Sequence, residues 1–221
     1  MKSVMFKCEL CAEIAGLPSR FASIYREDDW GRIILTSENF VVLPSIGQLG
    51  EGHLMIVSKA HHTAVAQLDI RSREELVVVS NRVRTWMQSR IAQHVVLFEN
   101  GDPAGNGRMG CTISHLHVHL VASNRPMTGL QMAFGLLGAE CIRGLDALPR
   151  LRDAYSCIEF ASAEGLLVRR RLPSQTLRKV VADQLGSKRW DWRLAGQEQQ
   201  LLELVRTGRE SFAHCDERRA A

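Results

Sequence analysis

The chain has 221 residues, with 28 Lys or Arg against 24 Asp or Glu, a formal net charge of +4, and a hydrophobic share of 45%. A chain of this length can bury enough surface to form one generous domain, or a domain with a sizeable appendage, without a disulfide scaffold. The small excess of positive charge argues against a nucleic-acid partner and favours a small anionic ligand.

The N-terminal and uncharged segments indicate neither export nor a membrane partner. Lys2 and Lys7 interrupt the N-terminal segment, where a secretory signal has an unbroken apolar run. The longest uncharged stretch, residues 126–139, is far shorter than the roughly 20 apolar residues that span a bilayer. We therefore expect a cytoplasmic protein whose six cysteines are thiols or metal ligands.

The first half of the chain predicts three strands followed by a helix. Two β-rich runs, residues 32–35 and 40–43, flank four polar residues and predict an antiparallel hairpin. Residues 53–57 follow a glycine-rich turn and predict a third strand. Ser72 and Glu75 have the spacing of a capping box and predict the start of a helix. Its apolar residues recur at three- and four-residue spacing and form one core-facing stripe: Leu76, Val79, Val83, Trp86 or Met87, and Ile91.

Residues 94–99 and 115–122 predict a fourth and a fifth strand. The order βββαββ predicts an α+β fold, in which an antiparallel five-stranded sheet carries a helix on one face. Residues 1–125 are expected to form this domain, and residues 126–221 a C-terminal extension packed on it. The extension is expected to hold a helix-like stretch, a hairpin and two helices at residues 130–151, 155–171, 174–185 and 197–206.

Three histidines alternate along the fifth predicted strand. Alternate side chains of a strand point to the same side, so His115, His117 and His119 share one face. A solvent-exposed strand face is usually built from Thr, Lys, Glu or Ser rather than from three imidazoles. One metal ion bound by all three is awkward, because residues two apart along a strand lie ~6.6 Å apart. We therefore predict divided roles for the three imidazoles.

The sequence HLHVHLV at residues 115–121 matches the signature of the histidine triad (HIT) superfamily of nucleotide hydrolases and transferases, which the chain resembles. Residues 52–61 look like the strand G-H-x-L-V-I-P-K-x-H of that family, with Ser58 in place of its proline. Residues 98–101 and 110–113 stand where its phosphate-binding loop precedes the triad. The resemblance covers roughly residues 6–125. Residues 173–193 are similar to the tail of some longer bacterial HIT-like proteins.

The resemblance implies an enzyme in which His117 is the nucleophile. A neutral imidazole can attack phosphorus and form a phosphoramidate that water later cleaves. His119 would stabilise charge on the α-phosphate, and Asn100, Gly110 and Thr112 would contribute to the phosphate-binding loop. The expected substrate is a dinucleoside polyphosphate or a nucleoside phosphoramidate. The alternatives are a nucleotidyltransferase with a phosphate acceptor and a non-catalytic nucleotide-binding module, and a homodimer is implied in each case.

Two departures from the family pattern concern substrate binding. Ser45 stands where the family commonly carries Asp or Asn to hold the ribose hydroxyls, so we expect weak ribose discrimination. Cys111 replaces the glutamine of the phosphate-binding loop, and a thiol is a poor hydrogen-bond donor. Cys111 is interpreted either as a small side chain that shapes the loop or as a second nucleophile.

Cys8 and Cys11 have the spacing of a metal-binding pair. Some HIT proteins and the related galactose-1-phosphate uridylyltransferases bind structural zinc through such a pair and two histidines. By this resemblance the ligands are Cys8, Cys11, His61 and His115, with His62 as a rival for the third position. The alternative is a pair of reduced thiols without a metal.

The extension offers two further candidates for ligand binding. Ser174 precedes a helix with Gln175 and Arg178 near its start, which predicts either a simple N-cap or an anion site at the helix N-terminus. Trp190 and Trp192 either stack on a nucleobase or pack on the domain.

Overall fold

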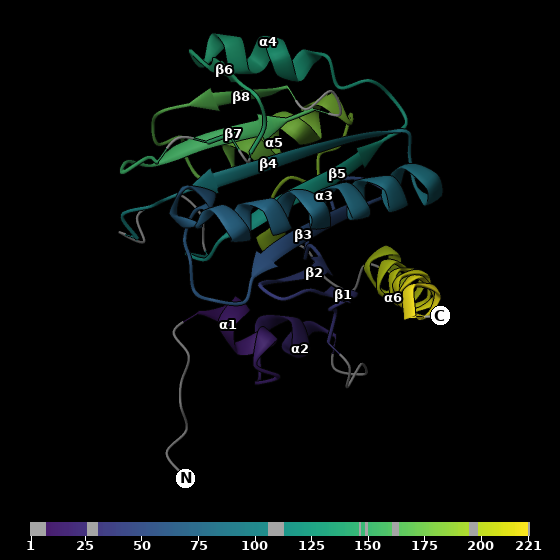
Figure 1. Cartoon of the computed structure of the whole chain (residues 1–221). Helices are drawn as coiled ribbons and strands as arrows, with labels where there is room; N and C mark the ends of the chain where they lie inside the picture. Colours follow the sequence, from purple (N-terminus) through teal and green to yellow (C-terminus); the bar gives the residue numbers. More distant parts are fainter. Residues whose placement is uncertain are drawn as a thin grey trace.

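The computed structural model describes residues 8–25, 31–105, 113–145, 147–148, 150–160, 164–194 and 199–220, with side chains up to residue 213. In this part of the chain, eight strands form one sheet in the order β1-β2-β3-β5-β4-β7-β8-β6, and all paired neighbours run antiparallel (Figure 1). The strands are β1 (Leu35–Thr36), β2 (Phe40–Pro44), β3 (His53–Ser58), β4 (His94–Gly101), β5 (His117–Ser123), β6 (Glu140–Ile142), β7 (Tyr155–Glu159) and β8 (Gly165–Val168). The predicted α+β class with an antiparallel sheet is confirmed.

The helices of the described residues lie on both faces of this sheet. They are α1 (Glu9–Ile14), α2 (Arg20–Ile24), α3 (Ile70–Arg90), α4 (Gly129–Leu136), α5 (Thr176–Gln184) and α6 (Gln199–Ala220), with short 3-10 turns η1 (Val65–Gln67) and η2 (Trp192–Leu194). None of them is long and apolar enough to cross a bilayer.

The sheet is larger than the five strands expected. The C-terminal hairpin β7–β8 pairs with β4 in the register Leu97↔Glu159 to Gly101↔Tyr155, and β6 pairs with β8 beyond it. A strand edge exposes unpaired N–H and C=O groups, which an added strand satisfies. β4 is therefore an interior strand of the sheet, because it pairs with β7.

The division of the chain at residue 125 stays a prediction, and so does the homodimer.

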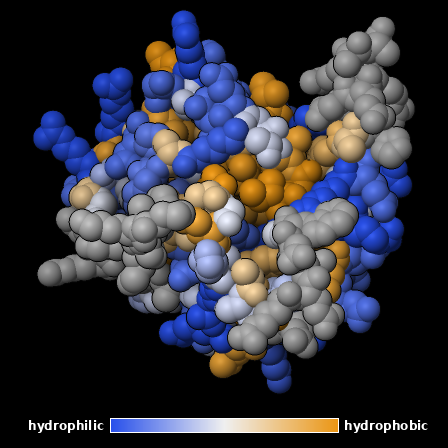
Figure 2. Space-filling model, turned by 90° about the horizontal axis from the view of Figure 1, so that it is seen from below, coloured by the Kyte–Doolittle hydropathy of each residue, from blue (hydrophilic) through white to orange (hydrophobic). Residues whose placement is uncertain are grey.

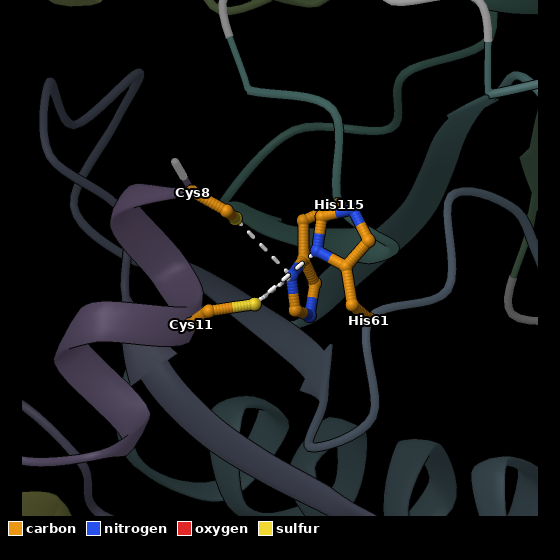
Figure 3. Close-up of side chains that lie close together, drawn as sticks. All are labelled: Cys8, Cys11, His61 and His115. Atoms are coloured by element: carbon orange, nitrogen blue, oxygen red, sulfur yellow. Dashed lines mark hydrogen bonds between the residues drawn. The ribbon is translucent and has the colours of Figure 1, made fainter. Parts of the chain in front are cut away.

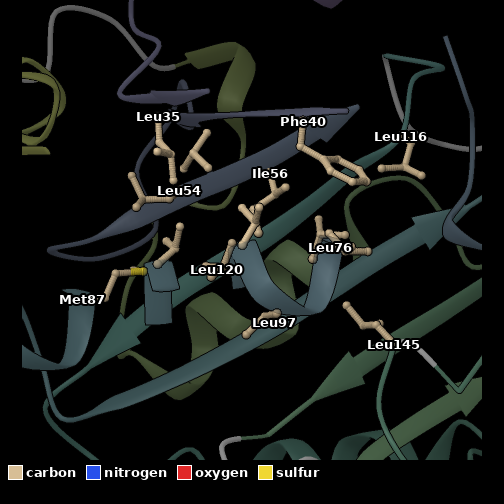
Figure 4. Packing of buried hydrophobic residues seen from close by; sticks show 14 of the residues in the cluster. Leu35, Phe40, Leu54, Ile56, Leu76, Met87, Leu97, Leu116, Leu120 and Leu145 are labelled. Carbon is tan, nitrogen blue, oxygen red and sulfur yellow. The ribbon is translucent and has the colours of Figure 1, made fainter. Parts of the chain in front are cut away.

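Alternation along the strands separates two hydrophobic clusters. Leu54, Ile56, Leu97 and Leu120 belong to one face, where they pack with the apolar stripe of α3 (Figure 4). The apolar side of α6 joins the same cluster through residues such as Leu201 and Phe212, whose ring lies 5.5 Å from that of Trp86. The stripe predicted for the helix is therefore the core-facing side of α3, with Ile91 just past its end.

The opposite face of the sheet is covered at its two ends. At the β2–β3 end, α1 packs Leu10 on Val41, Leu43, Met55 and Val57. At the β4–β8 end, α4 and α5 pack on Val96, Phe98 and Val121. The middle of this face, over β5, is left for the histidines. Figure 2 shows the side of the molecule that carries α1 and α2, where hydrophobic residues gather near the centre and hydrophilic ones surround them.

The start of the long helix differs from the prediction. α3 begins at Ile70, and its N-cap is Asp69, whose carboxylate accepts the backbone N–H of Ser72 at 2.7 Å. Ser72 is thus inside the helix and caps nothing. Glu75 instead accepts bonds from the hydroxyl of Ser37 (2.6 Å) and the backbone N–H of Asn39 (2.9 Å). These partners hold the β1–β2 turn against α3. They are distant in sequence from Glu75, so no local sequence pattern predicts them.

Three predictions for the extension are also corrected. Of the helix-like stretch at residues 130–151, the part that the structure describes is helical only in α4, and residues 140–142 form β6. Ser174 does not cap the next helix, because α5 begins at Thr176 and its N-cap position is Gln175. Gln175 has φ 59° and ψ 16°, the left-handed conformation that L side chains rarely adopt. The last helix is longer than expected and reaches Ala220.

Candidate active site

The three histidines of the HLHVHLV motif do not all lie in the strand. β5 begins at His117, and its register with β3 places His117 opposite Val57 and His119 opposite Met55, on the partly open middle of the sheet. His115 precedes the strand. The neighbouring Leu116 bonds through its N–H to the carbonyl of His62 (2.6 Å), which fixes this turn on the loop after β3. The expected single histidine face is therefore split between two sites.

The His117 ring is oriented by a backbone bond. Its Nδ1 lies 2.6 Å from the carbonyl oxygen of His115, and because a carbonyl only accepts, Nδ1 carries the proton. Burial lowers the pKa of His117 below its usual range. The bond to the His115 carbonyl raises this pKa, whereas the charges of Arg178 and Arg32 lower it further. The ring is therefore neutral near pH 7, with the lone pair on Nε2.

The His119 ring is held by a second histidine and an aromatic ring. Its Nδ1 lies 2.8 Å from Nε2 of His53, and its ring stacks on Phe98 with centroids 4.5 Å apart. Burial lowers the pKa of both His53 and His119 well below the usual range, so this is a hydrogen bond between two neutral imidazoles. The His117 and His119 rings meet edge to face at 4.9 Å.

A cavity of about 270 Å³ lies over these histidines and is lined by His117, His119, Ser45 and Asn100 among the predicted residues. Gly110, Cys111 and Thr112 lie outside the described residues. The Asn100 side chain accepts the hydroxyl proton of Ser156 from β7 at 2.7 Å, and the buried Ser45 hydroxyl donates to the carbonyl of Ile46 at 3.2 Å. The extension thus helps to orient Asn100.

Several lining residues received no role, or an ambiguous one, from the sequence. Phe21 and Arg32 come from the segment before β1, and no local motif marks them. Gln175, Arg178 and Trp192 come from the extension, where the sequence predicts either a structural or a ligand-binding role for them. The guanidinium of Arg20 lies over the Trp192 ring, 4.7 Å from its centroid.

A cluster of two cysteines and two histidines lies beside the start of β5 (Figure 3). Its members are Cys8, Cys11, His61 and His115. Their nearest sulfur and nitrogen atoms all lie within 4.8 Å of one another. Cys11 Sγ is 3.2 Å from Nδ1 of His61 and 3.4 Å from Nδ1 of His115, which is also 3.4 Å from Cys8 Sγ. His62 is not a member of this cluster.

The chemistry of this cluster fits a zinc ion. Sulfur and nitrogen ligands of a tetrahedral zinc lie roughly 3.6 Å apart, close to the distances observed here. Nε2 of His115 donates to the carbonyl of Ser58 at 2.7 Å, so Nδ1 carries the lone pair that a metal needs. Burial, followed by the neighbouring Cys8, raises the pKa of Cys11 to about 11, a cost to thiolate formation that a bound cation would offset.

The chain folds into an antiparallel sheet in which half-buried His117 and buried His119 line a pocket, beside a cluster of two cysteines and two histidines, and this fold is of the histidine triad class. Residues 19–135 match the family model described as scavenger mRNA decapping enzyme C-term binding. This match spans more than half of the chain, which therefore belongs to this family and to the HIT superfamily of nucleotide-binding proteins and hydrolases.

Solved structures with similarity to this chain include three bacterial proteins. A HIT family protein from Bacillus anthracis is 16% identical with a TM-score of 0.43, covering 60% of this chain and 96% of that one. A HIT family hydrolase from Legionella pneumophila is 20% identical with a TM-score of 0.39, covering 54% and 95%. A DUF4931 family protein from Bacillus cereus is 11% identical with a TM-score of 0.47, covering 81% and 99%. Among curated proteins there is no match.

Proposed function

We propose that the protein is a nucleotide hydrolase that cleaves at the α-phosphate of a nucleotide derivative through a nucleotidyl intermediate on His117. The observation that carries the proposal is the bond from His117 Nδ1 to the carbonyl of His115, which leaves Nε2 as the nucleophilic atom. The same ring lines a cavity together with His119 and Asn100. A neutral imidazole held in this way needs no further base before it attacks phosphorus.

The reaction has two displacements. Nε2 of His117 attacks the α-phosphorus, the P–N bond forms, and the bond to the leaving group breaks with its electron pair, so that a polyphosphate leaves as its anion and an amine leaves with a proton taken from solvent. Water then attacks the same phosphorus, the P–N bond breaks, and a nucleoside monophosphate leaves, while the protons of the water stay with the products. His117 returns to its neutral form.

His119 is proposed to stabilise the charge that develops on the α-phosphate. Its Nδ1 is engaged by His53 and its ring rests on Phe98, so its orientation is set before the substrate binds. A preorganised donor in a site that excludes water is worth far more than the same donor in solution. Asn100, itself oriented by Ser156, is the second proposed phosphate ligand from the described residues.

Zinc is proposed as a structural ion held by Cys8, Cys11, His61 and His115. Bound there, it would tie α1 to the turn that precedes β5 and stabilise the start of the catalytic strand. His117 is not among its ligands and stays available to the substrate.

A panel of nucleotide derivatives, incubated with and without orthophosphate and analysed by chromatography, tests this proposal. A hydrolase releases nucleoside monophosphate without orthophosphate, whereas a nucleotidyltransferase needs the acceptor and forms the diphosphate. His117→Ala should lower turnover at least about a thousandfold at an unchanged melting temperature. His94→Ala, at the far end of β4, is the matched control and should keep full activity.

Rapid quenching with α-labelled substrate should trap an acid-labile, base-stable adduct that is absent from His117→Ala. Near-normal turnover by that variant would overturn the proposed nucleophile. Tight nucleotide binding without turnover of any derivative would instead favour a nucleotide-binding module.

A further inference from the structure

A buried arginine from the C-terminal part of the chain lines the cavity beside the catalytic histidines. Arg178 belongs to the first turn of α5 and is only 6% exposed. It lines the same cavity as His117 and His119. Its positive charge reaches the histidines, since it lowers the pKa of His53, His117 and His119 in addition to the larger effect of burial.

The Arg178 guanidinium is fixed by two distant parts of the chain. Nε donates to the carbonyl of Trp190 at 2.8 Å, and Nη2 donates to the carbonyl of Gly47 at 2.5 Å. Gly47 lies in the turn before β3, and Trp190 follows α5. A guanidinium keeps its charge at any relevant pH, and one that is already immobilised loses little conformational entropy when a ligand binds.

The other buried arginine of the cavity, Arg32, has a different environment. It forms a bidentate ion pair with Glu13, with distances of 2.8 and 2.9 Å, and also donates to the carbonyl of Pro44. Both side chains of the pair are almost completely buried, at 3% and 7% exposure. Arg32 therefore serves mainly to hold α1 against β2, whereas the carbonyls of Trp190 and Gly47 hold Arg178 in the wall of the cavity that the extension builds.

We propose that Arg178 binds the phosphate group next to the reacting one. On this proposal the enzyme prefers substrates whose leaving group carries phosphate over substrates whose leaving group is an amine. The inference rests on the proposed function, because it takes His117 as the nucleophile at the α-phosphate. His119 and Asn100 serve that α-phosphate, whereas the planar guanidinium of Arg178 matches two oxygens of a neighbouring phosphate. A phosphoramidate has no anion to offer there.

Steady-state kinetics with two substrates of the same nucleoside, a dinucleoside tetraphosphate and a phosphoramidate, tests this role. Arg178→Met removes the charge and keeps most of the side-chain volume. We expect it to lower kcat/KM for the tetraphosphate 10- to 100-fold more than for the phosphoramidate, as loss of a charged hydrogen bond predicts. Arg178→Lys should restore part of the preference. Arg171→Met changes an exposed arginine of the same extension and should leave the ratio unchanged.

A purely structural role for Arg178 would lower both kcat/KM values by the same factor, and that result would overturn the inference. Calorimetry on the unmodified protein covers the case in which Arg178→Met does not fold. A non-hydrolysable α,β-methylene nucleoside diphosphate should bind at least fivefold more tightly than the monophosphate, and a smaller gain would count against Arg178. If no substrate is turned over, the proposed function fails, while the binding comparison still decides this inference.

Discussion

Glu99 provides a quantitative test of the packing on the α3 side of the sheet. It belongs to β4 and is buried to 1% exposure on the α3 side of the sheet. One carboxylate oxygen accepts the N–H of Val65 at 2.8 Å, and the other accepts the hydroxyl proton of Tyr155 at 2.7 Å. Burial nevertheless raises the pKa of Glu99 to about 7, because desolvation outweighs these two bonds.

The sign of the effect on stability follows from proton binding. Between the unfolded pKa of 4.5 and the folded pKa of about 7, the folded protein binds more protons at Glu99 than the unfolded chain does. Its contribution to stability is therefore fully present below about pH 4.5 and is lost as the pH rises through 7. The shift corresponds to ~3 kcal/mol in all, of which about 2 kcal/mol falls between pH 5.5 and pH 8.

Glu99→Gln removes this titration, because an amide does not ionise. Urea unfolding of both proteins at pH 5.5 and pH 8 should show the variant gaining about 2 kcal/mol relative to the original protein as the pH is raised. The difference between the two proteins isolates Glu99 from the buried histidines, whose titration is common to both. Glu51→Gln, at an exposed position, is the control and should show no such gain. A pH-independent difference for Glu99→Gln would refute the reasoning.

Three further predictions concern the metal site, the ribose and the extension. Cys11→Ser should lower the zinc content and the melting temperature, while the protein that remains folded keeps most of its turnover rate. His62→Ala should retain zinc. Metal analysis and thermal melts test both expectations. Because Ser45 has no carboxylate, 2′-deoxy substrates should be turned over within about a hundredfold of their ribose counterparts, and a larger preference contradicts this. Gln175→Gly relieves the left-handed backbone but removes the bonds at 3.1 Å to Asp191 and 3.4 Å to Trp192. We expect KM to rise several-fold while the unfolding free energy changes by less than about 1 kcal/mol. An unchanged KM would contradict a role of the extension in lining the substrate-binding cavity.

Local patterns in the sequence determined much of the fold. Alternating apolar residues in HLHVHLV specify a strand and put His117 and His119 on one side of it, because successive side chains of a strand point in opposite directions. The stripe of α3 was predicted for the same kind of reason, since a period of 3.6 residues brings Leu76, Val83 and Met87 to one face. Periodicity of this kind is a property of neighbouring residues and needs no knowledge of the rest of the chain.

Only the tertiary structure decided which distant groups meet. The pairing of β7 with β4, the contact of Glu75 with the β1–β2 turn, and the bond from Arg178 to Gly47 join segments that no local period relates. The same holds for the membership of His61 rather than His62 in the cysteine cluster, because adjacent residues of a loop differ only in the direction of their side chains. These long-range contacts depend on which backbone and side-chain polar groups still lack hydrogen-bond partners once the sheet has formed. The packing of the whole chain determines which groups those are.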